Sequence, residues 1–226
     1  FTIIVDERFN EPDDIVFHAF EYGGEVTLQG NMEVGHTLYV KKDATLNLNG
    51  YTLKNHKDNV YTDLIIVEQG ATLTINGEGT IEAVTGNDGY AVIADGVVII
   101  NGGTFNGKDN YNGFNVCASK GATVNIKGGK FLPVHSGSLY GEGVINVMGG
   151  EFFDDPSARV AAGCKAEQEN GIWTVKMTDE AKLRKVLAEG GEVTLEEDIT
   201  IAAKLEVTTT EAIVVNGNNK TISNLV

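Results

Sequence analysis

The sequence predicts an all-β protein that folds as a right-handed parallel β-helix, a solenoid of short strands with short capping α-helices. Three observations predict this fold class. Similar strand-like phrases recur every 21 to 27 residues, each phrase ends in Asn-Gly or Gly-Gly, and a longer segment recurs after 167 residues. Internal periods of the shorter kind are typical of solenoids, in which each repeat buries its apolar face against its neighbours.

Each recurring phrase alternates between apolar and polar or small residues, which is the pattern of a strand with one buried face. A glycine precedes most of the phrases, and a hydrophobic residue returns after each glycine turn. The five phrases are Ala44–Gly50, Ala71–Gly77, Val97–Gly103, Ala122–Gly129 and Val144–Gly150. The returning hydrophobic residues are Leu53, Ile81, Phe105, Phe131 and Phe152.

The likeness of the phrases indicates that equivalent strands stack on one another. The steps between Leu48, Ile75, Ile100, Ile126 and Val147 are 27, 25, 26 and 21 residues. A parallel β-helix fits this pattern, because each coil of two or three strands lies about 4.8 Å from the previous coil. An antiparallel meander also has short strands, but its strands need not resemble one another. Coils of this length exceed the hexapeptide repeats of left-handed solenoids, so we expect the right-handed form.

Segments of variable length separate the phrases, notably 85–89, 108–112 and 134–143. In repeat folds such insertions form loops on one side of the stack, and that side is often the binding face. We therefore expect the loops to protrude from one side.

The longer repeat duplicates the beginning of the solenoid. Gly23–Leu28 recurs letter for letter as Gly190–Leu195, and the same offset of 167 aligns Leu38 with Leu205 and Gly50 with Gly217. We expect the two copies to fold in the same register without a gap.

An amphipathic helix is predicted before each copy. In the second copy Thr178 is the expected N-cap, with two acidic residues in the first turn, and in the first copy the helix is expected to start at 12–14. The apolar residues of the two helices, spaced i, i+3 and i+4, are Val16, Ala19, Phe20 and Leu183, Val186, Leu187. Because the end of a solenoid exposes apolar interior and unpaired strand edges, we expect each helix to cap one coil.

These features divide the chain into three parts. Residues 1–12 are expected to be a lead-in strand that ends a preceding unit, 13–176 a complete β-helix unit with its capping helix, and 177–226 a second capping helix with the first coils of an incomplete unit. The hypothesis that follows is a slice of a longer array, or a chain whose final coils are completed by a partner subunit.

Composition excludes several classes of protein. The 226 residues include 28 glycines and 3 prolines, so turns depend on glycine and a collagen-like or proline-rich chain is excluded. A formal charge of −15, from 17 basic and 32 acidic residues, argues against binding to nucleic acid or to an anionic membrane. No apolar run reaches the roughly 18 residues of a membrane span.

Two sets of phrases resemble known families. Gly70–Gly77 and Gly102–Phe105 resemble the pectate-lyase-type right-handed β-helix superfamily. The junction of Asp155–Cys164 with Gly171–Val175, followed by Leu187–Leu195, is similar to repeat modules of bacterial surface proteins and of phage virion fibres or decoration proteins. The resemblance covers nearly the whole chain and implies the fold. It also implies either an enzyme or a passive extracellular spacer, display or adhesin module, because this architecture carries both.

A catalytic site of the superfamily would need residues that this chain largely lacks. A polysaccharide lyase would carry a carboxylate Ca²⁺ site and a basic proton acceptor, yet Arg8, Arg159 and Arg184 all lie away from the middle of the stack. A glycoside hydrolase would need carboxylates that converge on a groove, for which Asp154 and Asp155 are the candidates. The Asn-Thr-Asp, Gly-His-Gly and Arg-Ile-Lys stretches that accompany such a pair are absent. We interpret the pair as a polar turn before Pro156.

The remaining reactive side chains are scattered. The four histidines, His18, His36, His56 and His135, have no metal-ligand spacing. Cys117 is expected to pack as a small hydrophobe in or beside the core, and a bridge to Cys164 is an open alternative. The polar segments 87–88 and 109–112 could bind Ca²⁺ through oxygen ligands, but solvated turns are the simpler interpretation. We therefore predict no catalytic, cofactor-binding or metal-ligating residue.

The aromatic residues fall into two groups. Phe105, Phe131 and Phe152 repeat with the coils, so we predict an internal stack. Tyr90, Tyr111 and Tyr140 lie in or near the variable loops and are the candidates for exposed contacts with a sugar.

The sequence thus favours a non-catalytic structural module outside the cell, part of a virion decoration, a head or tail fibre, or a bacterial surface adhesin. Its expected partners are further copies or units of the same assembly, with a host glycan or receptor as an additional candidate. Two alternatives stay open: a carbohydrate-active enzyme that uses Asp154 and Asp155, and a glycan- or receptor-binding module that acts through the loops.

Overall fold

The computed structural model describes the chain except for residues 1–11, 57–62, 84–88, 108–112, 202 and 225–226. The chain forms two compact units. The first unit comprises residues 1–160 and 166–175, and the second comprises residues 161–165 and 176–226.

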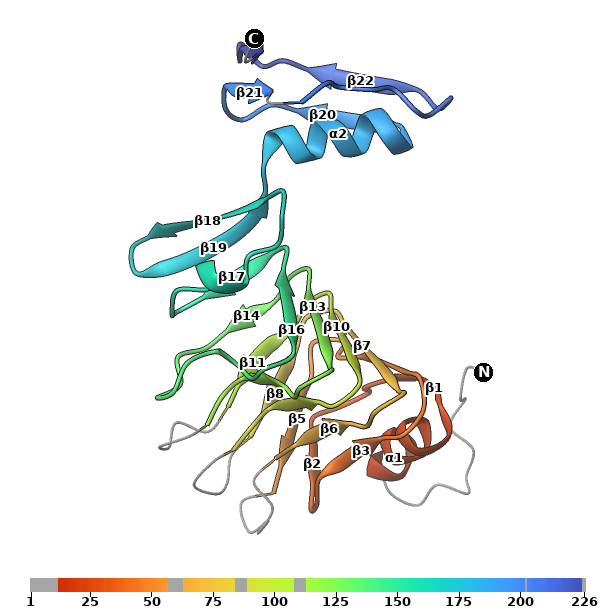
Figure 1. Ribbon diagram of the computed structural model, residues 1–226. Helices are drawn as coiled ribbons and strands as arrows, with labels where there is room; N and C mark the ends of the chain where they lie inside the picture. Colours follow the sequence, from red (N-terminus) through yellow and green to blue (C-terminus); the bar gives the residue numbers. More distant parts are fainter. Residues whose placement is uncertain (1–11, 57–62, 84–88, 108–112, 202, 225–226) are drawn as a thin grey trace. The chain divides into compact units, whose positions relative to one another are not determined.

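The first unit is a right-handed parallel β-helix whose coils each contribute one strand to three sheets, here named A, B and C (Figure 1). Sheet A contains β1 (Gly24–Thr27), β4 (Ala44–Asn47), β7 (Thr72–Asn76), β10 (Val97–Ile100), β13 (Thr123–Ile126) and β16 (Val144–Val147). The parallel strands of sheet B are β2 (Met32–Val34), β5 (Thr52–Asn55), β8 (Thr80–Glu82), β11 (Thr104–Asn106), β14 (Lys130–Phe131) and β17 (Gly150–Phe152). Sheet C contains β3 (Leu38–Val40), β6 (Ile65–Val67), β9 (Val92–Ala94), β12 (Val116–Ala118) and β15 (Leu139–Tyr140).

The predicted fold class is confirmed, because each strand pairs in parallel with its equivalent in the next coil. Val98, for example, pairs with Leu73 of one neighbouring coil and with Val124 of the other. The insertions lie on one side, as predicted. They connect sheet B to sheet C, between β5 and β6, β8 and β9, β11 and β12, and β14 and β15.

The core of the first unit consists of rows of inward-facing side chains that run from coil to coil. One row on sheet A joins Val26, Leu46, Ile75, Ile100, Ile126 and Val147 through consecutive strand pairs. All six side chains are buried. On sheet B the rings of Phe105 and Phe131 stack with centroids 5.0 Å apart, and those of Phe131 and Phe152 stack at 4.6 Å. The predicted internal phenylalanine stack is therefore confirmed.

One predicted register is wrong by two residues. Spacing of the phrases aligned Leu48 with Ile75, but the residue that pairs with Ile75 is Leu46. Leu48 is still fully buried, because it points into the corner where the following coils turn. A Cβ atom added to Gly79 or Gly103 would lie 2.7 Å from the Leu48 side chain. The leucine thus fills space that these glycines leave open.

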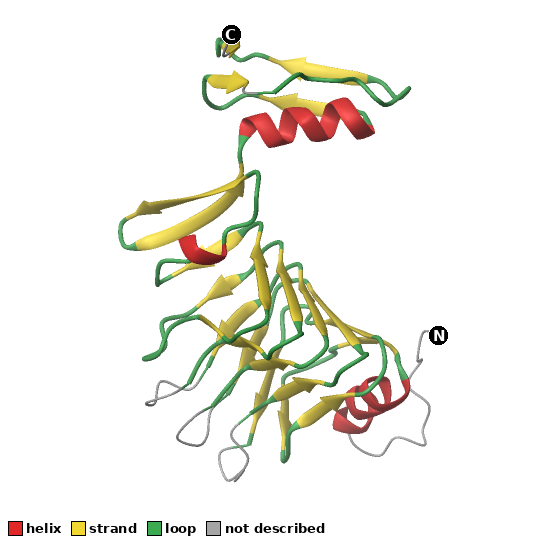
Figure 2. Cartoon of the chain, viewed as in Figure 1, coloured by secondary structure: helices red, strands yellow, loops and turns green. Residues whose placement is uncertain are grey.

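The two ends of the first unit are closed in different ways. Helix α1 (Pro12–Tyr22) packs on β1 to β4 and buries Val16, Ala19 and Phe20, as its periodicity predicted (Figure 2). At the other end of sheet B, β19 (Ile172–Met177) pairs antiparallel with β17 and is itself followed in the sheet by β18 (Cys164–Glu169). A single 3-10 turn, η1 (Ser157–Arg159), precedes this hairpin.

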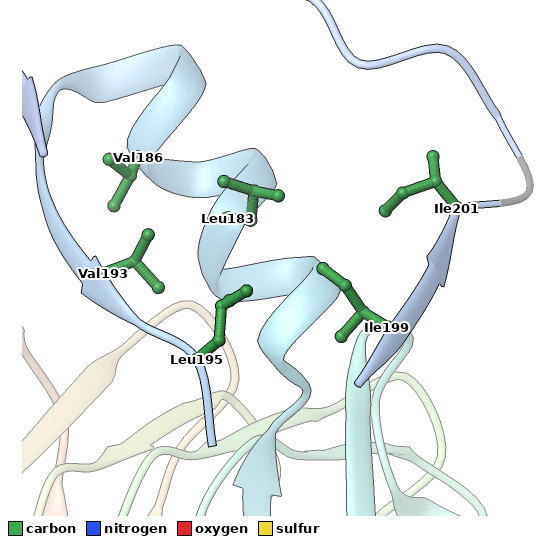
Figure 3. Close-up of a cluster of buried hydrophobic side chains, with 6 residues drawn as sticks. All are labelled: Leu183, Val186, Val193, Leu195, Ile199 and Ile201. Atoms are coloured by element: carbon green, nitrogen blue, oxygen red, sulfur yellow. The ribbon is translucent and has the colours of Figure 1, made fainter. Parts of the chain in front are cut away.

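The second unit repeats the beginning of the first. Helix α2 (Asp179–Glu189) is capped by the Thr178 hydroxyl, which accepts a hydrogen bond from the Ala181 amide at 3.2 Å, as predicted. The strands are β20 (Gly191–Thr194) and β22 (Ile213–Asn216), which pair in parallel, and β21 (Ile199–Ile201) and β23 (Ile222–Asn224), which also pair in parallel. The fully buried core residues, drawn in Figure 3, are Leu183, Val186, Val193, Leu195, Ile199 and Ile201.

The predicted gap-free offset of 167 holds only in the first coil of the second unit. Gly24 pairs with Ala44, 20 residues later, whereas Gly191 pairs with Ile213, 22 residues later. Structural equivalence in the second coil therefore follows an offset of 169. The two additional residues lie between β21 and β22, where the second unit has no strand equivalent to β3 among its described residues.

Candidate functional site

The acidic pair that sequence analysis singled out is built into turns. The Asp154 carboxylate accepts hydrogen bonds from the amide of Ser138, at 2.9 Å, and from the Ser138 hydroxyl. Asp155 accepts a hydrogen bond from the amide of Ser157 at 2.9 Å, and the hydrogen bonds from the Ser157 side chain and backbone lower the pKa of Asp155. Each carboxylate thus terminates its own turn, as the interpretation of a polar turn predicted.

Two of the three arginines are described, and both stabilise loops. A guanidinium nitrogen of Arg159 donates to the carbonyl of Gly141 at 2.8 Å. Arg184 pairs with Glu180 on α2 and donates to the carbonyl of Ala203 at 2.7 Å. Arg8 lies outside the described residues.

The described part of the chain contains no group of three or more His, Cys, Asp or Glu side chains positioned to hold a metal ion. The segments 87–88 and 109–112, considered above for Ca²⁺, are not fully within this part, so this finding leaves that hypothesis untested. His18 lies on α1 beside Tyr22, and His36 lies against Phe17. His56 lies 3.9 Å from Glu33, and His135 is on an exposed loop.

Both cysteines are free thiols, so the alternative of a Cys117–Cys164 bridge is excluded. Cys117 lies on β12 and is half-buried on the outer face of sheet C rather than within the core. Burial, together with the nearby carboxylates of Asp95 and Asp63, raises the pKa of the Cys117 thiol to about 11. A thiol with this pKa is protonated at neutral pH and is a poor nucleophile.

An aromatic column crosses the coils where the loops enter sheet C. The rings of Tyr90 and Phe114 stack at 5.7 Å, and those of Phe114 and Tyr140 stack at 4.4 Å. Tyr140 is 53% exposed. Two of the three tyrosines proposed from the sequence therefore meet here, while Tyr111 lies outside the described residues.

Sequence reasoning missed Phe114, the central ring of this column. The register of sheet C pairs Val116 with Val92, so Phe114 lies level with Tyr90. Aligning Ala91–Ala94 with Asn115–Ala118 in the sequence would have revealed this relation, since both segments precede their phrases by similar distances.

An outward-facing apolar row continues the column along sheet C. Strand pairing places five side chains in one line, namely Tyr39, Ile66, Ile93, Cys117 and Tyr140. The row and the aromatic column together are called the sheet C face below. Beside it lies a shallow hollow of about 450 Å³, lined by Glu68, Gln69, Asp95, Ser119 and Lys120. This face combines exposed aromatic rings with polar groups, which is the chemistry that binds sugars.

A second hollow follows the corner between sheets A and B. It has a volume of about 750 Å³ and is lined by Gly77, Glu78, Gly79, Asn101, Gly102, Gly103, Thr104, Gly129, Lys130, Gly150, Glu151 and Thr174. The glycines have a structural reason, because a Cβ atom at Gly102 or Gly128 would lie 2.8 Å from a carbonyl oxygen of the preceding coil. The charged lining includes Lys130 and Glu151, whose side chains are 3.8 Å apart and exposed. Such a surface pair contributes little to stability and leaves the hollow without a reactive arrangement.

An asparagine ladder covers the outer face of sheet A. The Asn76 amide donates to the side-chain oxygen of Asn47 at 3.0 Å, and the Asn101 amide donates to that of Asn76 at 2.7 Å. One strand position away, Asn146 donates to Asn125 at 2.9 Å. These side chains satisfy one another along the stack, so this face is suited to stiffening the solenoid.

The comparisons with known proteins give no further identification: no family model, no curated protein and no solved structure matches the chain. Among the described residues, neither helix is long and apolar enough to cross a membrane. The class of protein is thus defined by the fold alone, a parallel β-solenoid.

Proposed function

We propose that the chain is a non-catalytic structural module of an extracellular assembly, namely a virion decoration, a head or tail fibre, or a bacterial surface adhesin. The pectate-lyase-like superfamily and the virion or cell-surface setting belong to this proposal and follow from the phrases quoted above. The single observation that carries it is the repetition of one architectural block. A capping helix followed by solenoid coils occurs as α1 with β1 to β5 and again as α2 with β20 to β23.

Continuous side-chain systems support a mechanical role. The phenylalanine stack, the inward aliphatic rows and the asparagine ladder each extend over several coils, so every coil is locked to the next by packing and by hydrogen bonds. In solenoids stability is approximately a sum of repeat and neighbour-interface contributions, and a first unit of this kind is a stiff spacer.

The test compares catalysis with mechanical resistance. The protein is incubated with a panel of neutral and acidic polysaccharides, with and without Ca²⁺, and assayed for reducing ends and for unsaturated products. We expect no release above that of a heat-denatured sample, together with resistance of the first unit to proteolysis. Turnover that disappears in Asp154→Asn or Asp155→Asn would establish the enzymatic alternative instead.

A second function, binding of a host glycan, is favoured by one specific observation: the exposed aromatic rings of the sheet C face. An aromatic ring stacks on the apolar face of a sugar, and neighbouring polar groups orient the hydroxyls. Glycan-array binding that is lost in Tyr140→Ala and kept in Tyr22→Ala, an equally exposed tyrosine on α1, would support this function. Equal binding by both variants would contradict it.

A further inference from the structure

The second coil of the second unit leaves core positions uncovered. Val215 pairs with the buried Val193 yet is 41% exposed, and Ile222 pairs with the buried Ile199 yet is 46% exposed. The equivalent residues of the first unit, Leu46 and Leu53, are fully buried because the next coil covers them.

The backbone of this coil has a free edge. In the first unit β4 lies between β1 and β7, and β5 lies between β2 and β8. Among the residues that the structure describes, β22 and β23 each pair on one side only, with β20 and β21. The other side of each strand presents peptide groups that can pair with an incoming strand.

Despite the free edge, this coil is seated as a solenoid rung. The Thr221 amide donates to the Asp198 carboxylate at 2.7 Å, as the Thr52 amide donates to Asn31 at 2.9 Å in the first unit. The Asn218 side chain donates to the carbonyl of Leu195 at 3.2 Å, matching Asn49 with Leu28 at 3.0 Å. The edge therefore has the geometry of a rung that already accepts a following coil in the first unit.

We propose that β22 and β23 form a docking edge for a parallel β-solenoid coil supplied by another polypeptide. The occupant is an extended segment of two short strands with alternating apolar residues, which places its apolar side chains over Val215 and Ile222 by strand addition. The first unit shows the template, because β7 and β8 sit in this way on β4 and β5. This inference names the partner class of the proposed structural function and rests on it.

The charge of the edge suits such a partner. The chain carries −15 overall, but residues 203–224 contain two lysines, Lys204 and Lys220, and two glutamates, Glu206 and Glu211. A neutral edge on an acidic protein allows an acidic coil of the same type to approach without the repulsion that the rest of the surface would impose.

The probe is a labelled peptide with the sequence of residues 71–83, which forms the docked coil in the first unit and contains β7 and β8. Fluorescence anisotropy measures its binding to the full chain. We expect saturable binding that weakens about tenfold or more in Val215→Lys and Ile222→Lys, because a lysine over this edge loses the apolar contact. Val144→Lys is the matched control, since Val144 is an equally exposed strand valine in the first unit, and it is expected to bind as the wild type does.

A second readout covers the case in which a lysine variant is unstable. A peptide with lysine in place of the residue equivalent to Leu73 is titrated against the wild-type chain, and hydrogen exchange of β22 is measured with and without the original peptide. We expect the altered peptide to bind about tenfold or more weakly, and the original peptide to slow exchange of β22. Absence of saturable binding, equal binding to Val215→Lys, or self-association of the chain that excludes the peptide would overturn the proposal. Polysaccharide cleavage would overturn the structural function while leaving these binding results unchanged.

Discussion

Replacing Phe131 by alanine removes the middle ring of the phenylalanine stack. The Phe131 side chain is fully buried, and its ring contacts Phe105 on one face and Phe152 on the other, with centroids 5.0 and 4.6 Å away. Truncation of a buried phenylalanine typically costs about 3–5 kcal/mol through lost transfer free energy and the cavity left behind. Because two stacked neighbours lose their partner at once, we expect a free energy of unfolding reduced by about 4–5 kcal/mol.

Urea denaturation followed by fluorescence and by circular dichroism measures this loss. The chain has one tryptophan, Trp173, which pairs with Phe152 at the end of the same sheet, so its fluorescence reports on the first unit. For a unit of this size the loss corresponds to a fall in Tm of roughly 10–15 °C.

The control is Lys130→Ala on the same strand, whose exposed side chain makes one distant ion pair and is expected to cost less than about 0.5 kcal/mol. A Phe131→Ala protein within about 1 kcal/mol of the wild type would refute the inference that the stack fastens successive coils.

Three further predictions concern a corner, a ladder and an acid-sensitive cap. Gly96→Ala is expected to destabilise the first unit by about 1–3 kcal/mol, because the added Cβ would overlap carbonyl oxygens of the preceding coil, whereas Gly30→Ala, in open space, is expected to be neutral or stabilising in the same urea assay. Asn76→Ala breaks two ladder hydrogen bonds and is expected to cost about 1 kcal/mol, and a urea midpoint unchanged from the wild type would contradict a stiffening role. In the second unit burial alone would raise the pKa of Asp179, but hydrogen bonds from Lys182 and from the amides of Glu196 and Glu197 outweigh it and lower the pKa. A lowered pKa means that this stabilisation is complete above the ordinary carboxyl range, near pH 4, and is lost as the pH falls through the lowered value. Thermal melts from pH 7 to pH 2 should show the loss in the wild type and a smaller one in Asp179→Asn.

The sequence predicted the parallel stack because its cause is local and repeated. Each phrase carries its own alternation and its own glycine turn, and like strands bury like side chains. The same locality placed the helices, since Thr178 and the apolar residues at i, i+3 and i+4 lie within one or two turns of chain.

Register was harder to predict, because it depends on how side chains fill a corner in three dimensions. The phrases beginning at Ala44 and Ala71 look identical, yet Ala44 pairs with Leu73. Leu48 takes the corner volume beside Gly79 and Gly103, and this contact joins residues more than 30 positions apart. In the second unit, the longer connection before β22 shifts the register by two residues, which letter matching alone did not show.

The candidate surfaces show the same limit. Sequence analysis correctly separated the internal phenylalanines from the outer tyrosines, because the former recur with the glycine turns. It did not find Phe114 between Tyr90 and Tyr140, because that contact depends on the register of sheet C. The uncovered side chains of β22 and β23 were equally invisible, since burial of a strand is decided by the next coil.

Backbone nuclear Overhauser effects within sheet A test the central claim most directly, because they report which strands are neighbours. Thr74 should show contacts between amide and α-protons with Ile99, and Ile99 should show them with Asn125, so that the contacts step along the chain coil by coil. Close contacts between pairs of α-protons on strands adjacent in sequence, the signature of antiparallel hairpins, would contradict the parallel stack on which the account rests.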